Sequence, residues 1–141
     1  MITLARGQKT KLADLTPALQ ISAQLRAIAP GLVFDFSCFG VDGADQLSDD
    51  RYFVFYNQKA SPNNEIAMSG DGDFTIDLAR LPATIKKLVF VITLDGNGTL
   101  SQLQSGHFQL LAGGAAVANF EFRGSDFGQE KAIIAAEIYL K

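Results

Sequence analysis

Two aspartates in a glycine-rich turn and one aspartate within an apolar stretch are the side chains of this sequence best suited to bind a cation. Asp71 and Asp73 alternate with Gly70 and Gly72, and Asp35 lies among hydrophobic residues. Calcium takes about six to eight oxygen ligands, and glycine lets a backbone fold tightly enough to present them. A carboxylate on a strand beside an acidic turn also needs a positively charged partner. These residue types indicate a cation site, although Asp-Gly pairs more often form ordinary solvated turns.

Charge is distributed unevenly along the chain. Residues 35–77 contain nine acidic and two basic residues, whereas the remainder contains six acidic and ten basic residues. A concentrated negative charge attracts cations and repels the phosphates of nucleic acids. We therefore expect no nucleic-acid partner.

Residues suited to nucleophilic catalysis are few. The single histidine, His107, and the single cysteine, Cys38, fall in different predicted strands. The sequence contains no nucleophile elbow, no phosphate-binding loop and no pair of histidines for zinc. We expect a non-enzymatic protein with no catalytic residues, in which Cys38 belongs to the core.

Alternation of apolar and polar residues predicts strands through most of the chain. It is clear in residues 19–25, 32–39 and 74–78, whereas residues 86–94 form a continuous apolar strand. Residues 1–7 alternate weakly, and residues 65–68 suggest a short strand. Residues 107–111 and 117–122 are typical of a hairpin around Gly113 and Gly114. Residues 129–141 fit either a helix or a strand, and we favour a strand because a sheet needs its edges paired.

The run Tyr52, Phe53, Val54, Phe55, Tyr56 is the most aromatic part of the sequence. A turn signal precedes it, and Asn57 follows it. Aromatic and β-branched residues without polar interruption favour a strand buried on both faces. We therefore predict that this run forms a strand at the centre of a sheet.

These elements together predict an all-β fold. The 141 residues, of which 48% are hydrophobic, are enough for a single domain over 1–141. We expect a two-sheet, mainly antiparallel β-sandwich with little helix. The apolar runs are too short to span a membrane, and residues 1–7 lack the apolar core of a secretory signal, so we expect a cytoplasmic protein without membrane insertion.

Several segments of the sequence resemble one family. These are Leu-Ala-Arg-Gly-Gln-Lys at 4–9, Ser-Asp-Asp-Arg-Tyr-Phe-Val-Phe-Tyr-Asn-Gln at 48–58, Ser61-Pro62, and Leu81-Pro82 before Lys-Leu-Val-Phe at 87–90. They resemble the TerD-domain family of bacterial tellurium-resistance and stress-response proteins. The segment Gly-Ser-Asp-Phe-Gly-Gln-Glu-Lys-Ala at 124–132 is similar to the ending of the TerA-like branch.

The resemblance implies a cytoplasmic β-sandwich in which acidic loops at one end bind calcium. This sequence departs from the family pattern at three places. The first aspartate of an Asp-x-Asp pair is Val33, the family tryptophan is absent, and the long acidic loop is contracted to residues 70–73. Fewer carboxylates imply weaker calcium binding, or none.

Two functional hypotheses follow. In the first, calcium is bound by Asp35, Asp71 and Asp73, with Asp49 as a further candidate. In the second, the domain is a metal-free interaction or scaffold module of the same stress system. It would then dock onto paralogous tellurium-resistance proteins or membrane-associated partners through sheet edges or an apolar patch.

Overall fold

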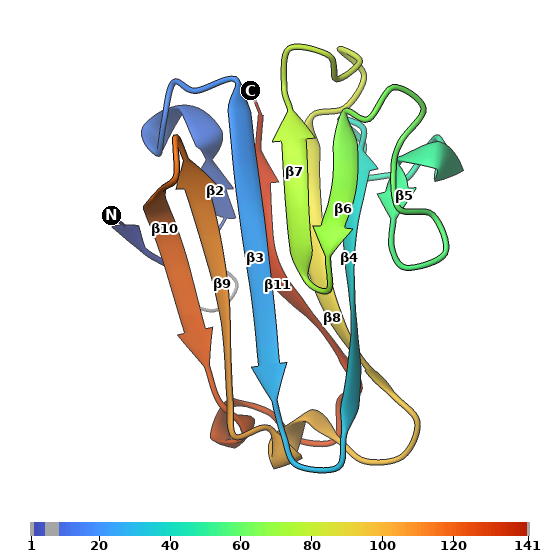
Figure 1. The fold of residues 1–141 in the computed structure, drawn as a ribbon, viewed down its shortest axis with the longest axis vertical. Helices are drawn as coiled ribbons and strands as arrows, with labels where there is room; N and C mark the ends of the chain where they lie inside the picture. Colours follow the sequence, from blue (N-terminus) through green and yellow to red (C-terminus); the bar gives the residue numbers. More distant parts are fainter. Residues whose placement is uncertain (1, 5–8, 141) are drawn as a thin grey trace.

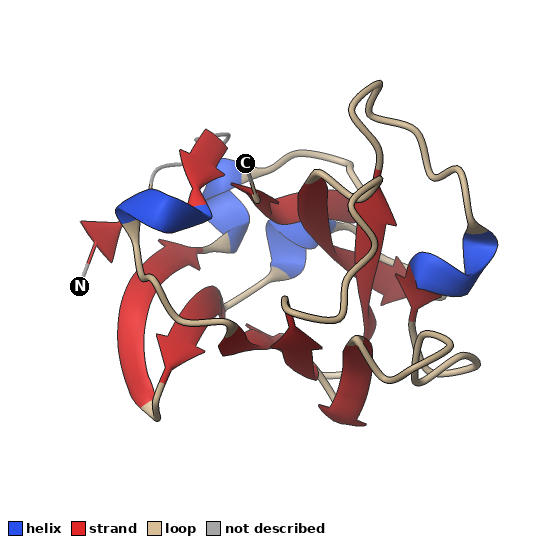
Figure 2. Cartoon of the chain, turned by 90° about the horizontal axis from the view of Figure 1, so that it is seen from above, coloured by secondary structure: helices blue, strands red, loops and turns tan. Residues whose placement is uncertain are grey.

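Two sheets pack face to face in the computed structural model, which describes residues 2–4 and 9–140 (Figure 1). The first sheet, in spatial order, contains β1 (Ile2–Thr3), β10 (Ala115–Phe122), β9 (Ser105–Ala112), β3 (Gln20–Ile28), β7 (Asp73–Asp77) and β6 (Ile66–Gly70). The second contains β2 (Lys9–Lys11), β11 (Ala132–Tyr139), β8 (Lys87–Asp95), β4 (Val33–Val41) and β5 (Phe53–Val54). The two layers are visible from one end in Figure 2.

Helix is limited to short 3-10 turns in the part of the chain that the structure covers. These turns are η1 (Leu12–Asp14), η2 (Asp50–Tyr52), η3 (Leu100–Gln102) and η4 (Gly124–Asp126). None of them has the length and apolar character that a membrane-crossing helix requires.

Most neighbouring strands run antiparallel, which confirms the predicted mainly antiparallel sandwich. The exceptions involve the two N-terminal strands. β1 pairs in parallel with β10, and β2 pairs in parallel with β11. The sandwich is therefore mixed at its N-terminal edges.

The core forms because alternate residues of each strand point between the sheets. In β4, Phe34, Phe36 and Cys38 are buried. Val33, which lies on the opposite face of the strand, is 61% exposed. Phe90 of the second sheet packs between Phe74 and Phe108 of the first, with ring centroids 6.0 and 5.1 Å away. These contacts join the two layers.

The alternating patterns located most strands correctly. The strands predicted at 19–25, 32–39, 65–68, 74–78 and 86–94 correspond to β3, β4, β6, β7 and β8. The predicted hairpin is formed by β9 and β10, and the turn between them has positive φ at Gly113 and Gly114. The C-terminal segment is the strand β11. In the N-terminal segment only Ile2–Thr3 is a described strand, since residues 1 and 5–8 lie outside the described part.

The prediction of a central strand at residues 52–56 was wrong. Asp49 accepts a hydrogen bond from the Arg51 amide and so caps the turn η2, which includes Tyr52. The strand β5 that follows has only two residues and lies at the edge of its sheet. Burial alternates through the run and ends at Tyr56, which is 55% exposed, so only one face is covered. β8 and β4 take the inner positions of this sheet instead.

Candidate functional site

One flank of the sandwich carries strand edges that extend beyond their partners. β7 pairs with β3 only as far as Gln24, and β5 pairs with β4 only at Cys38 and Phe39. No described strand therefore lies next to the edges of residues 26–28 in β3 and 33–37 in β4. We call these two edges the open flank.

The tight β6–β7 turn places Asp71 beside the open flank. Gly72 follows with a φ of +80°, and a Cβ at this position would collide with the carbonyl oxygen of Leu25. The Gly72 carbonyl accepts a hydrogen bond from the Leu25 amide at 2.7 Å. Glycine is required here because it tolerates both the left-handed conformation and the close approach to β3.

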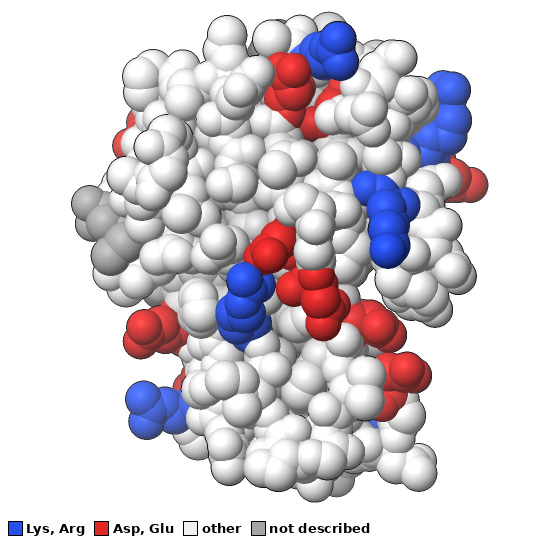
Figure 3. All heavy atoms as spheres, viewed as in Figure 1, with Lys and Arg blue, Asp and Glu red and all other residues white. Residues whose placement is uncertain are grey.

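Asp35 and Asp95 lie on the outer face of the second sheet near the same turn. Val33 pairs with Asp95 and Asp35 with Thr93, so the two carboxylates are diagonal neighbours on one face. Burial raises the pKa of Asp35, and the charges of Asp95 and Asp71 raise it further. In Figure 3, acidic side chains gather across the middle of the face that carries the β6–β7 turn, with a basic side chain beside them.

These three carboxylates have no compensating cation within the described residues. Salt bridges between described residues occur elsewhere, and none of these involves Asp35, Asp71 or Asp95. The structure thus brings together two of the residues predicted from the sequence and adds Asp95, which sequence reasoning missed. Asp95 directly follows the strand predicted at 86–94, but its proximity to Asp35 depends on the register between β8 and β4.

Asp73 lies close to this group but already has a basic partner. Its Oδ1 atom is 2.8 Å from Nη2 of Arg26, and Nη1 of Arg26 donates to the Leu25 carbonyl at 2.8 Å. A cation bound to Asp73 would therefore compete with the Arg26 guanidinium.

Asp49 is separate from the other three predicted ligands. Its Oδ2 atom is 2.8 Å from Nη2 of Arg51, and hydrogen bonds from Arg51 lower the pKa of Asp49. Phe53 pairs with Phe39, four residues along β4 from Asp35, which corresponds to roughly 13 Å of strand. In the structure Asp49 caps the 3-10 turn η2, and it does not lie beside Asp35.

The fit of these residues to a metal ion is partial. Among the residues whose positions are described, no three Asp, Glu, His or Cys side chains are close enough to hold a metal ion together. Asp35 and Asp71 offer the hard carboxylate oxygens that calcium prefers, and backbone carbonyls and water would have to complete the shell.

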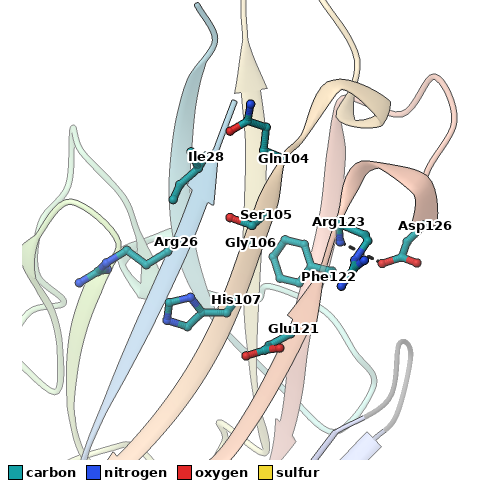
Figure 4. A pocket seen from close by; sticks show the side chains of 10 residues that line it. All are labelled: Arg26, Ile28, Gln104, Ser105, Gly106, His107, Glu121, Phe122, Arg123 and Asp126. Atoms are coloured by element: carbon teal, nitrogen blue, oxygen red, sulfur yellow. Dashed lines mark hydrogen bonds between the residues drawn. The ribbon is translucent and has the colours of Figure 1, made fainter. Parts of the chain in front are cut away.

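A hollow of about 390 Å³ lies on the outer face of the first sheet (Figure 4). The residues that line the hollow include three that pair across neighbouring strands, namely Arg26 of β3, His107 of β9 and Glu121 of β10. Its charges are of both signs, and Figure 4 shows the Arg26 side chain pointing away from its centre. His107 therefore lies on the outer face of one sheet, whereas Cys38 is buried in the other, where burial raises the pKa of its thiol.

Comparisons with known proteins identify relatives over the whole chain. A family model described as the TerD domain matches residues 1–141. General stress protein 16U of Bacillus subtilis (strain 168) is 30% identical over 164 residues, covering 98% of this chain and 83% of that protein. Tellurium resistance protein TerA of Alcaligenes sp. is 34% identical over 89 residues, covering 61% of this chain and 26% of that protein.

Solved structures show the same fold at low sequence identity. A crystal structure of a protein of unknown function has a TM-score of 0.60 at 16% identity, with 84% of this chain and 78% of that chain covered. A homologue of the telluride resistance protein TerD from Streptomyces coelicolor A3(2) has a TM-score of 0.58 at 16% identity, with 84% and 79% covered. At this identity the likeness concerns the fold alone.

Proposed function

The chain belongs to the TerD domain family, and we propose that it is a non-enzymatic module of tellurium resistance or the general stress response that binds calcium weakly. The names of its relatives, a general stress protein and a tellurium resistance protein, support the biological part of the proposal. We further propose that it acts in the cytoplasm.

The observation that carries the calcium proposal is the uncompensated group of Asp35, Asp71 and Asp95. Burial is the first cause of the raised pKa of Asp35, and the like charges of Asp95 and Asp71 disfavour its ionisation further. A divalent cation would remove this repulsion. We propose that Asp35 and Asp71 bind calcium directly, and that Asp73 joins them only where calcium displaces Arg26.

The affinity should be low because few carboxylates contribute. We expect a Kd of about 10⁻⁴ to 10⁻³ M, at the weak end of the range of protein calcium sites, because affinity falls with the number of charged ligands. Asp49 should contribute little because its charge is already neutralised by Arg51.

Calorimetric titration of metal-free protein with calcium tests the proposal. We expect a saturable signal that is lost in Asp35→Asn and in Asp71→Asn. Asp14→Asn is a matched control, since Asp14 is an exposed acid on η1, away from the open flank. A flat titration up to millimolar calcium, or equal loss in Asp14→Asn, would refute the calcium site.

The free strand edges favour a second candidate function, that of a metal-free interaction module. Its partners would be paralogous stress or tellurium-resistance proteins, or membrane-associated proteins. The test is purification of the native complex with and without a chelator. Partners that stay bound in the chelator support this function, and partners released by it favour a calcium-dependent assembly.

A further inference from the structure

The edge of β4 between Val33 and Ser37 offers unpaired backbone groups. In the described part of the chain, the N–H and C=O groups here that face away from β8 have no hydrogen-bond partner. The neighbouring edge of β6 differs, because the Met68 amide donates to the Lys59 carbonyl and the Ser61 amide to the Ile66 carbonyl. Free edges of this kind pair readily with an added strand.

An apolar hollow lies beside this edge, between β3 and β4. Its volume is about 300 Å³, and its apolar lining includes Leu25, Leu32, Phe34 and Phe36. Phe34 and Phe36 point inward from β4, so the inner side of the edge is apolar. A strand placed beside β4 would direct every second side chain toward this hollow.

The outer side of the same edge is negatively charged. Asp35 and Asp95 share the outer face of the sheet, and Asp71 lies at the margin of the hollow. The nearby basic side chain, Arg26, is held by Asp73. The other side chains of an added strand would therefore meet carboxylates that have no basic partner among the described residues.

We infer that this edge of β4 takes up an extended segment of another protein as an additional strand. The segment alternates apolar residues, which enter the hollow, with lysine or arginine, which face Asp35 and its neighbours. Backbone hydrogen bonds supply the binding energy, and the alternation supplies the specificity.

This inference shares carboxylates with the calcium proposal but does not depend on calcium binding. Basic side chains and calcium would compete for Asp35 and Asp71. Peptide binding in EDTA tests the added strand alone, and calcium titration without peptide tests the metal site alone. Either can fail without the other.

The probe is a capped seven-residue peptide in which valine and lysine alternate, added to ¹⁵N-labelled protein in EDTA. We expect saturable binding that protects amides of residues 33–37 from hydrogen exchange. Asp35→Asn and Asp71→Asn should each weaken binding about two- to fivefold, as expected for partly exposed ion pairs. Asp14→Asn should leave it unchanged.

Two control peptides separate strand addition from simple charge attraction. Glutamate in place of lysine should weaken binding through repulsion, and by more than either aspartate substitution does. N-methylation of alternate peptide nitrogens keeps the charge but blocks strand hydrogen bonds, and should abolish binding. The inference is overturned if the valine–lysine peptide does not bind, if the methylated peptide binds equally well, or if protection falls outside β4.

Discussion

Asp35 on β4 and Asp71 in the β6–β7 turn belong to different sheets, yet they lie close enough for their negative charges to interact. Burial raises the pKa of Asp35, and Asp95 and Asp71 add to the rise. An acid whose pKa is higher in the folded state opposes folding when it is ionised. The carboxylates proposed to bind a cation at the open flank therefore lower the stability of the metal-free protein.

Asp35→Asn should stabilise the metal-free protein at neutral pH. The penalty for ionising Asp35, which comes from burial and from repulsion by Asp95 and Asp71, is absent below pH 3.8, the ordinary pKa, and is fully present above the raised pKa of the folded state. We expect the melting temperature in EDTA to rise by about 1–3 °C near neutral pH. Thermal unfolding followed by circular dichroism should show this gain shrinking as the pH falls from the raised pKa toward 3.8, and no gain below 3.8. A lower melting temperature at neutral pH would contradict the repulsion.

Calcium should stabilise the native protein by binding it in preference to the unfolded chain. At about ten times the Kd, the gain in the free energy of unfolding is about 1.4 kcal/mol. Thermal melts with and without calcium measure this gain. Asp71→Asn should remove the calcium-dependent shift, and magnesium serves as a comparison ion because it demands a stricter octahedral shell. A shift that persists in Asp71→Asn would place the site elsewhere.

Gly72→Ala should disturb the turn that carries Asp71. The residue has a φ of +80°, and the added Cβ meets the Leu25 carbonyl oxygen, so we expect a loss of about 2 kcal/mol or more. Gly113→Ala is the matched control, because Gly113 also has positive φ but has open space around it. Urea unfolding should show the smaller loss at Gly113, about 1 kcal/mol. Equal losses would mean that the contact with β3 is unimportant.

Tyr52→Phe should destabilise the loop that precedes β6. Tyr52 donates a 2.5 Å hydrogen bond to the carboxylate of Glu65, which is 1% exposed. Removing one partner of a buried hydrogen bond costs about 1–3 kcal/mol. Tyr56→Phe is the control because Tyr56 is 55% exposed, and its urea unfolding should match that of the unmodified protein.

The hydrogen bond between Tyr52 and Glu65 also predicts that the stability of the protein depends on pH. Burial alone would raise the pKa of Glu65, but hydrogen bonds from Tyr52, Ser61 and the Asn63 amide contribute to a net lowering. Stability from the ionised form is complete above pH 4.5 and is lost as the pH falls through the lowered pKa. Urea unfolding against pH should show this acid loss, and Tyr52→Phe should reduce its size. An unchanged loss in the variant would contradict the assignment to Glu65.

The positions of the strands were predictable because every second side chain of a strand points into the core, so buried and exposed residues alternate along the sequence. In β4 the sequence pattern correctly separated Phe34 and Phe36 from Val33 and Asp35, since one face is covered and the other is not. The run at residues 52–56 misled because aromatic content indicates strand propensity but not the place of a strand in its sheet. Capping by Asp49 removed Tyr52 from the strand altogether.

The candidate site was predictable only in part. Acidic residues of a turn and a strand are visible in the sequence, which identified Asp35 and Asp71. The arginine partner of Asp73 was not predictable, because Arg26 lies 47 positions from Asp73 and meets it only through the pairing of β3 with β7. Asp95 was missed for the same reason, since strand register decides which distant side chains become neighbours.

The parallel pairing of the N-terminal strands has a consequence for synthesis of the protein. Ile2 and Thr3 pair with Ala118 and Asn119, and residues 9–11 pair with residues 137–139. The strands that leave the ribosome first must therefore wait until their partners have been translated. The nascent chain cannot close either layer early, and contacts of such wide sequence separation slow the final assembly.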